Sequence, residues 1–108
     1  MASPYSDLNP AIEEQRFLDV CRKAGEIINL GLLVYSPITH CHPIAKIYDL
    51  PKDYKYWKKV NHEFIMWADE VWILMLPGWD YSAGIKDELR FADSFLKPVR
   101  FLTDREVK

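Results

Sequence analysis

The most constraining feature of this sequence is the apolar run Val-Trp-Ile-Leu-Met-Leu at residues 71–76. It contains no polar residue and does not alternate, and Pro77-Gly78 ends it. A strand with one face in water would alternate polar and apolar residues, whereas a strand covered on both faces need not. The run therefore predicts a central parallel strand with helices packed on both sides, which places the chain in the α/β class.

Capping residues and helical periodicity predict three helices. Asn9 followed by Pro10 is a favourable helix start, and Gly31 is suited to a left-handed cap at the end of that helix. Between them, apolar residues recur at three- and four-residue spacing: Phe17, Val20, Cys21, Ala24, Ile27 and Ile28. Asp53 is the expected cap of a second helix that ends near Asp69, with an inner face made of Trp57, Val60, Phe64 and Ala68. Ser82 is the expected cap of a third, whose core stripe is Ile85, Leu89, Ala92 and Leu96.

The remaining segments are short or irregular. Residues 32–35 and 98–102 are apolar and are predicted to be strands, the first of them buried on both faces. Residues 39–52 contain prolines and polar residues without a clear period, so this segment is predicted to be a long loop of the kind that forms lids or binding sites.

Alternation of helices and apolar strands predicts one domain, residues 1–108, with a short and mainly parallel sheet in a three-layer Rossmann- or flavodoxin-like arrangement. Chains of this length seldom divide into two cores. Such a sheet normally begins with a strand before the first helix, but only residues 1–4 are available for it here. The first strand is therefore expected to be truncated or vestigial, or else to lie upstream of this sequence.

Composition excludes several classes of function. The formal charge is −2 with no run of one sign, so no nucleic-acid polymer is expected as a partner. No stretch approaches the ~20 apolar residues of a membrane span, and the first residues do not form a secretion signal. Cys21 and Cys41 lie in segments that favour free thiols over a disulfide, so the predicted location is the cytoplasm.

Ligands of open α/β sheets bind beyond the carboxyl ends of the strands, where the amino ends of helices carry partial positive charge. Residues 3–7, 36–42 and 77–82 are the loops expected there. Glu88 lies roughly 70° from the middle of its helix's apolar stripe at 100° per residue, on the semi-buried side. It is either a glutamate at the rim that reaches water or a carboxylate positioned as a nucleophile or base. Asp69 is either a turn residue or the second carboxylate of an acid–base pair.

Two other features are candidates for site residues. His40, Cys41 and His42 are all possible metal ligands, but no fourth partner stands at a recognised spacing, so no metal is expected. Trp79 lies in the 77–82 loop and is a candidate for stacking on a base, although tryptophans of this chain are more simply read as core or interface residues.

The segment ADEVWILMLPGWDYSAGIKDELRFA, with ASPYS at the start and SPITHCHPI in the middle, resembles the nucleoside 2-deoxyribosyltransferase-like superfamily. The likeness is greatest to a branch of small bacterial and phage proteins. It implies that Glu88, in the signature SAGIKDE, attacks C1′ of an N-glycoside and that Asp69 assists proton transfer to the leaving base. It also implies a 5′-monophosphate substrate, since relatives with serine at the position of Ser82 are the hydrolases of nucleotides.

The resemblance thus implies an N-glycoside hydrolase that cleaves a (deoxy)nucleoside 5′-monophosphate without metal or cofactor. Base exchange and non-catalytic nucleotide binding are the alternatives, and a homo-oligomer is expected. The catalytic residues implied are Glu88 and Asp69, and the substrate-binding residues implied are Ser3, Pro4, Tyr5, His40, Trp79, Ser82 and Gly84.

Overall fold

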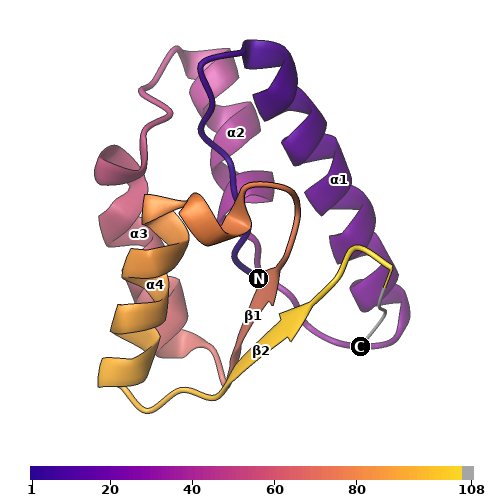
Figure 1. Cartoon of the computed structure of the whole chain (residues 1–108), viewed down its shortest axis with the longest axis vertical. Coiled ribbons are helices and arrows are strands. Elements are labelled where there is room, and N and C mark those ends of the chain that lie inside the picture. The colour runs from indigo at the N-terminus through magenta and orange to yellow at the C-terminus, as the bar shows by residue number, and fades with distance from the viewer. Residues whose placement is uncertain (106–108) are drawn as a thin grey trace.

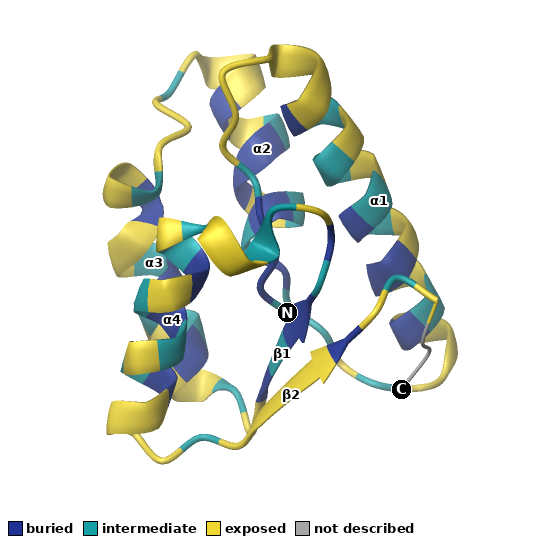
Figure 2. Ribbon diagram, viewed as in Figure 1, coloured by how far each residue is buried: buried dark blue, intermediate teal, exposed yellow. Residues whose placement is uncertain are grey.

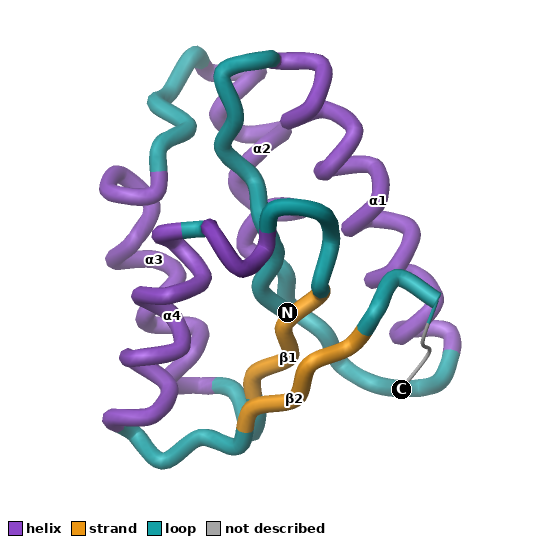
Figure 3. The backbone as a smooth tube through the Cα atoms, viewed as in Figure 1, coloured by secondary structure: helices purple, strands orange, loops and turns teal. Residues whose placement is uncertain are grey.

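The computed structural model describes residues 1–105 and contains four α-helices, one short 3₁₀ helix and two strands (Figure 1). In chain order these elements are α1 (Pro10–Asn29), α2 (Pro37–Tyr48), α3 (Tyr54–Trp67), β1 (Val71–Leu74), η1 (Trp79–Tyr81), α4 (Ala83–Ser94) and β2 (Val99–Leu102). Figure 3 shows that helix and loop make up most of the chain and that strand is confined to two short segments. The chain is therefore an α/β domain with a small sheet, as the sequence predicts.

The sheet is parallel, and its third strand is reduced to a single bridge. β1 and β2 pair in parallel from Val71 opposite Val99 to Leu74 opposite Leu102. On the other edge of β1, Ala2 forms an isolated parallel bridge with Ile73. Its backbone N–H donates to the carbonyl of Trp72 at 2.7 Å, and its carbonyl accepts from the N–H of Leu74 at 2.8 Å. Within the described residues, the first strand is therefore as short as expected.

Helices cover both faces of this sheet, and successive residues of β1 point to opposite sides. Val71 and Ile73 pack in a core with Ile65 of α3 and Ile85 and Ala92 of α4. Leu74 packs in a second core, on the α1 side, with Val20, Ile38, Leu76 and Leu102. Figure 2 shows the buried positions of α1 to α4 turned toward the interior. The unbroken apolar run of β1 follows from this two-sided cover.

The predicted helix starts are confirmed at the level of single hydrogen bonds. The side chain of Asn9 accepts from the N–H of Ala11 at 3.0 Å, that of Asp53 from Tyr56 at 3.3 Å, and that of Ser82 from Ile85 at 3.2 Å. Each contact satisfies an amide that the first turn of a helix leaves free. Gly31 has a positive φ of 90°, which fits its predicted place just past the end of α1.

The predicted strand at residues 32–35 is wrong. These residues belong to no strand, and Leu33 is 93% exposed. A strand needs a neighbour with free backbone groups along several residues, and on this side of β1 only Ala2 is paired. An apolar segment without such an edge stays an irregular connection between α1 and α2.

The predicted loop at residues 39–52 is also wrong over most of its length, because α2 runs from Pro37 to Tyr48. The side chain of Ser36 caps this helix by accepting from the N–H of Thr39 at 3.3 Å, and Pro37 occupies the first turn. Ile38, Cys41 and Ala45 form its buried stripe at three- and four-residue spacing. Pro43 lies inside the helix, and the helix ends at Asp49 in the left-handed conformation.

Among the helices described, none combines the length and the apolar character that a bilayer span requires.

Candidate functional site

A cavity of about 380 Å³ lies where the chain leaves β1. Its wall contains the first turns of α2, α3 and α4, represented by Pro37, Tyr54 and Gly84. Residues 3–7, which lead into α1, complete it. The amino ends of three helices thus surround one space, and each contributes partial positive charge there. This arrangement favours an anionic group in the ligand.

Glu88 is the buried carboxyl group of this cavity. It lies on α4, is only 5% exposed and borders the cavity. Burial raises the pKa of Glu88 from 4.5 to about 7; the amino group of Met1 opposes the rise, and the neighbouring charge of Asp87 adds to it. A carboxyl group with a pKa near 7 exchanges its proton in the range where most cellular chemistry occurs. The projection that placed Glu88 on the semi-buried side is confirmed.

The start of α4 brings Ser82 and Gly84 to the same wall. The hydroxyl oxygen of Ser82 accepts from the N–H of Ile85, so its own hydrogen is free to donate to a ligand. Gly84 lies against the ring of Tyr54, and a β-carbon at residue 84 would be 3.0 Å from Cδ1 of that ring. The absence of a side chain at Gly84 therefore lets Tyr54 pack closely against the first turn of α4.

A polar network holds Tyr54 in this position. Its hydroxyl donates to Oδ2 of Asp87 at 2.7 Å, and Nε2 of His62 lies 2.7 Å from the same oxygen. Nζ of Lys58 is 3.5 Å from the other oxygen of Asp87. The ring of His62 stacks on Phe91 with centroids 3.9 Å apart. The network joins α3 to α4 immediately beside Glu88.

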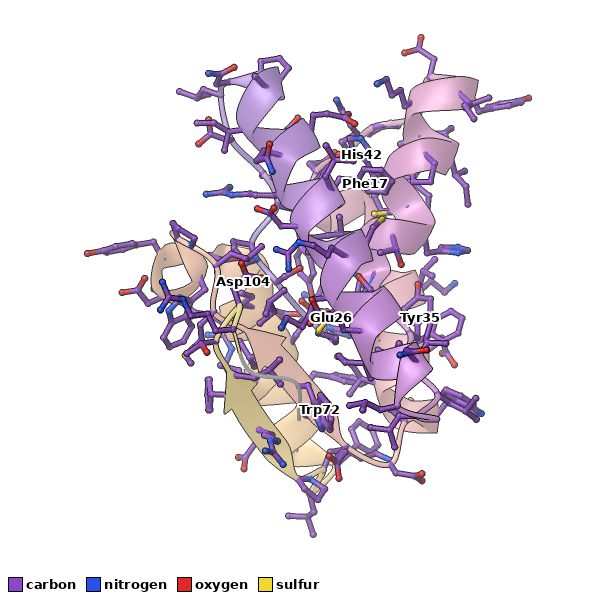
Figure 4. The ribbon with its side chains drawn as sticks, turned by 90° about the vertical axis from the view of Figure 1, so that its right-hand side faces the viewer. Phe17, Glu26, Tyr35, His42, Trp72 and Asp104 are labelled. Atoms are coloured by element: carbon purple, nitrogen blue, oxygen red, sulfur yellow. The ribbon has the colours of Figure 1, made fainter. Side chains whose placement is uncertain are left out.

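The N-terminal segment is fixed by two contacts with the helices. The hydroxyl of Tyr5 lies 2.5 Å from Nδ1 of His42, whose Nε2 is 2.9 Å from a carboxylate oxygen of Glu14. Figure 4 shows His42 beside Phe17, and their rings stack at 4.4 Å. The guanidinium group of Arg16 donates to the carbonyls of Tyr5, Ser6 and Pro77 at 3.2, 2.9 and 3.2 Å. Arg16 thus ties the segment to the loop after β1.

Two buried polar atoms in the cavity wall have no hydrogen-bond partner within the described chain. They are Oγ of Ser3 and Oδ1 of Asn61. Sequence reasoning predicted Ser3 but missed Asn61, because it assigned the inner face of α3 to Trp57, Val60 and Phe64. The buried face is instead Trp57, Asn61 and Ile65. A polar residue in the middle of that four-residue spacing is the signal that could have identified Asn61.

The structure brings most, but not all, of the predicted site residues together. Ser3, Pro4, Tyr5, Ser82, Gly84 and Glu88 border the cavity. His40 is exposed on α2, and Trp79 packs against the core and against Phe101 with ring centroids 5.6 Å apart. Asp69 is exposed just before β1 and borders a second hollow of about 740 Å³, which also reaches Asn61 and Glu88. Asp69 therefore does not share the wall formed by Ser82.

The possible metal ligands of α2 are separated by the helix. His40 lies beside the ring of Tyr35, whereas the two ring nitrogens of His42 contact Tyr5 and Glu14. Within residues 1–105, no three side chains of His, Cys, Asp or Glu are arranged to hold a metal ion.

The fold and the cavity define an α/β domain with a buried, proton-exchanging carboxyl group at the amino ends of three helices. Comparison with protein families matches residues 1–104 to the family described as "Domain of unknown function (DUF1937)". The match covers nearly the whole chain, so the chain belongs to this family. No curated protein matches it.

Proposed function

We propose that this protein is an N-glycoside hydrolase that cleaves the bond between base and sugar in a (deoxy)nucleoside 5′-monophosphate. The observation that carries the proposal is the burial of Glu88 in a cavity ringed by the amino ends of three helices. A carboxylate there is suited to attack an electrophilic sugar carbon, while the helix ends suit an anionic phosphate. The resemblance of SAGIKDE to the superfamily signature supports the same assignment.

The reaction proceeds by double displacement. The carboxylate of Glu88 forms a bond to C1′ as the bond to the base breaks, and the base leaves with the bonding electron pair and takes up a proton. Water then attacks C1′ of the resulting ester, the bond between C1′ and Glu88 breaks, and the water gives up one proton, which replaces the proton taken by the base. This releases the sugar 5-phosphate and restores the carboxylate. Because Asp69 borders only the second hollow, its proposed part in carrying the proton requires that the base leave toward that hollow.

The phosphate group has suitable partners at one side of the cavity. The hydroxyl of Ser82 is free to donate. The first amides of α4 carry the partial positive charge of that helix end, which suits an anion. Arg16 and Lys52 border the cavity and add positive charge. A carboxylate in place of Ser82 would repel the phosphate, which favours a nucleotide over a free nucleoside.

A screen of nucleoside 5′-monophosphates for release of free base tests the proposal. Glu88→Gln should abolish base release, and Glu63→Gln, which alters an exposed glutamate of α3, should leave it unchanged. Repeating the reaction with a second free base separates the alternatives. Exchange without hydrolysis would identify a transferase, and binding without turnover, unaffected by Glu88→Gln, would identify a nucleotide-binding module.

The proposal includes a homo-oligomer in the cytoplasm. Large apolar side chains such as Leu33 and Trp67 are exposed in the isolated chain, and exposed apolar surface is typical of interfaces between subunits. Light scattering coupled to gel filtration tests the first part: a mass equal to that of one chain would contradict it.

A further inference from the structure

Asn61 is the most deeply buried polar group of the cavity whose acceptor oxygen is unused. Its side chain is 5% exposed, lies in the second half of α3 and borders both hollows, as Glu88 does. Oδ1 of Asn61 has no hydrogen-bond partner within the described residues. Native structures rarely leave a buried acceptor unpaired, because water no longer compensates for the lost hydrogen bond.

The fold itself does not explain an amide at this position. The residues one turn before and after Asn61 on the buried face of α3 are Trp57 and Ile65, which are apolar and pack in the cores. A leucine at residue 61 would continue that face without an unpaired oxygen. The amide is therefore better explained by a group that occupies the cavity than by the packing of α3 on α4.

The chemistry of the wall indicates which kind of group this is. Asn61 is neutral and offers an acceptor and a donor, and Ser3, whose Oγ is also buried without a partner in this wall, has a hydroxyl that can do both. The charged groups of this cavity are other residues, among them Glu88, Arg16 and Lys52. A neutral, hydrogen-bonding ligand group such as a hydroxyl matches Asn61, whereas a cation would be met by the carboxylate instead.

We propose that Asn61 is a specificity-determining residue whose Oδ1 accepts a hydrogen bond from a hydroxyl group of a sugar phosphate bound beside Glu88. The identity of the sugar phosphate rests on the proposed function, but the role of Asn61 does not require turnover. Because the unused oxygen is satisfied only when the ligand is bound, Asn61 favours ligands that carry the hydroxyl over those that lack it.

Calorimetric binding of three sugar phosphates tests this inference: ribose 5-phosphate, 2-deoxyribose 5-phosphate and 1,2-dideoxyribose 5-phosphate, which differ successively by one hydroxyl. The wild-type protein should lose affinity by at least about tenfold at one of the two steps. Asn61→Leu should remove that step and leave binding of the poorer ligand unchanged. Asn29→Leu, which makes the same change at an exposed position of α1, should keep the step.

Thermal unfolding without ligand separates this role from a structural one. Asn61→Leu should unfold at the same or a higher temperature than wild type, because it removes an unpaired buried acceptor. If Asn61→Leu does not fold, Asn61→Ala carries the same binding prediction. The inference is overturned if the wild type binds none of the three compounds or binds all three equally. It is also overturned if the step survives in the Asn61 variants, or if their binding falls equally for all three. If the affinity step is present but no base is released from any nucleotide, the proposed hydrolase activity is rejected and the role of Asn61 is not.

Discussion

The hydroxyl group of Tyr54 donates a hydrogen bond of 2.7 Å to Oδ2 of Asp87, the residue that precedes Glu88. This contact joins the first turn of α3 to the middle of α4, and His62 approaches the same oxygen. Burial alone would raise the pKa of Asp87, but the hydrogen bonds from Tyr54 and His62 outweigh that effect and lower it. Asp87 is therefore a carboxylate that both positions a wall of the cavity and acts on the neighbouring Glu88 by its charge.

Replacing Asp87 with asparagine should weaken the network and shift the titration of Glu88. Asp87→Asn should lower the free energy of unfolding by about 1–2 kcal/mol, since the bonds that the carboxylate accepts become weaker or are lost. It should also lower the pKa of Glu88, because a negative charge beside that group disappears. Urea denaturation and NMR titration of the Glu88 carboxyl measure the two effects. Asp93→Asn, at an exposed position of the same helix, should change neither.

The raised pKa of Glu88 predicts how stability depends on pH. The folded chain keeps the Glu88 proton up to about pH 7, whereas the unfolded chain releases it near the ordinary value of 4.5. The folded state therefore binds more protons in this window, and its stability falls as pH rises through it. Glu88→Gln should remove this loss, which makes the variant more stable by on the order of 3 kcal/mol above pH 7 and little changed at pH 4. The free energy of unfolding of both proteins is measured by denaturation from pH 4 to 8. A difference between variant and wild type that stays the same at every pH would contradict the prediction.

Two glycines should respond oppositely to replacement by alanine. Gly84→Ala places a β-carbon 3.0 Å from Cδ1 of Tyr54, so the ring must shift by a few tenths of an ångström, which disturbs its hydrogen bond to Asp87. We expect a loss of about 1–2 kcal/mol of stability and weaker ligand binding. Gly25 lies in α1, and a β-carbon added there would meet nothing within 4 Å, so Gly25→Ala should stabilise the helix by up to ~1 kcal/mol. Urea denaturation of both variants measures the difference in sign.

Arg16 should keep two segments of the cavity wall, residues 2–8 and 77–82, well ordered. Its guanidinium group reaches three backbone carbonyls on two segments, a pattern that a single ammonium group cannot reproduce. Arg16→Lys should speed amide exchange in residues 2–8 and 77–82 and cost about 1 kcal/mol of stability. Arg22→Lys is the matched control, because Arg22 pairs with Asp104 at the surface and such pairs contribute little. Exchange that is equal in the two variants would show that Arg16 has no such role.

Local signals determined how much of the fold could be predicted. Asn9, Asp53 and Ser82 each cap a helix through an amide two or three residues away, so short sequence patterns were sufficient. Ser36 followed by Pro37 repeats the pattern of Asn9 and Pro10, but the prolines and histidines that follow obscured α2. Residues 32–35 could not be assigned from composition, because strand formation depends on a partner edge that their own sequence does not describe.

The candidate site was only partly predictable for a related reason. The position of Glu88 follows from the geometry of one helix, and the loops near it follow from the general rule for parallel sheets. Asn61 was missed because the predicted inner face of α3 contained Val60 and Phe64. The buried face contains Asn61 and Ile65, each one residue further along the helix. Asp69 lies just before β1, as the sequence predicts, but the amino end of a strand lies at the opposite edge of a parallel sheet from the loop that leads to Ser82.

The single bridge at Ala2 makes the cavity easier to open than the rest of the fold. Two backbone hydrogen bonds join Ala2 to β1, and residues 3–5, which follow directly, form one wall around Glu88. If these two bonds break together with the contacts of Tyr5 with His42 and Arg16, the wall can swing out while all four helices keep their packing. Loss of the binding site and melting of the domain are then separate events, and a protease that cuts this segment would disable the protein while leaving a folded body behind.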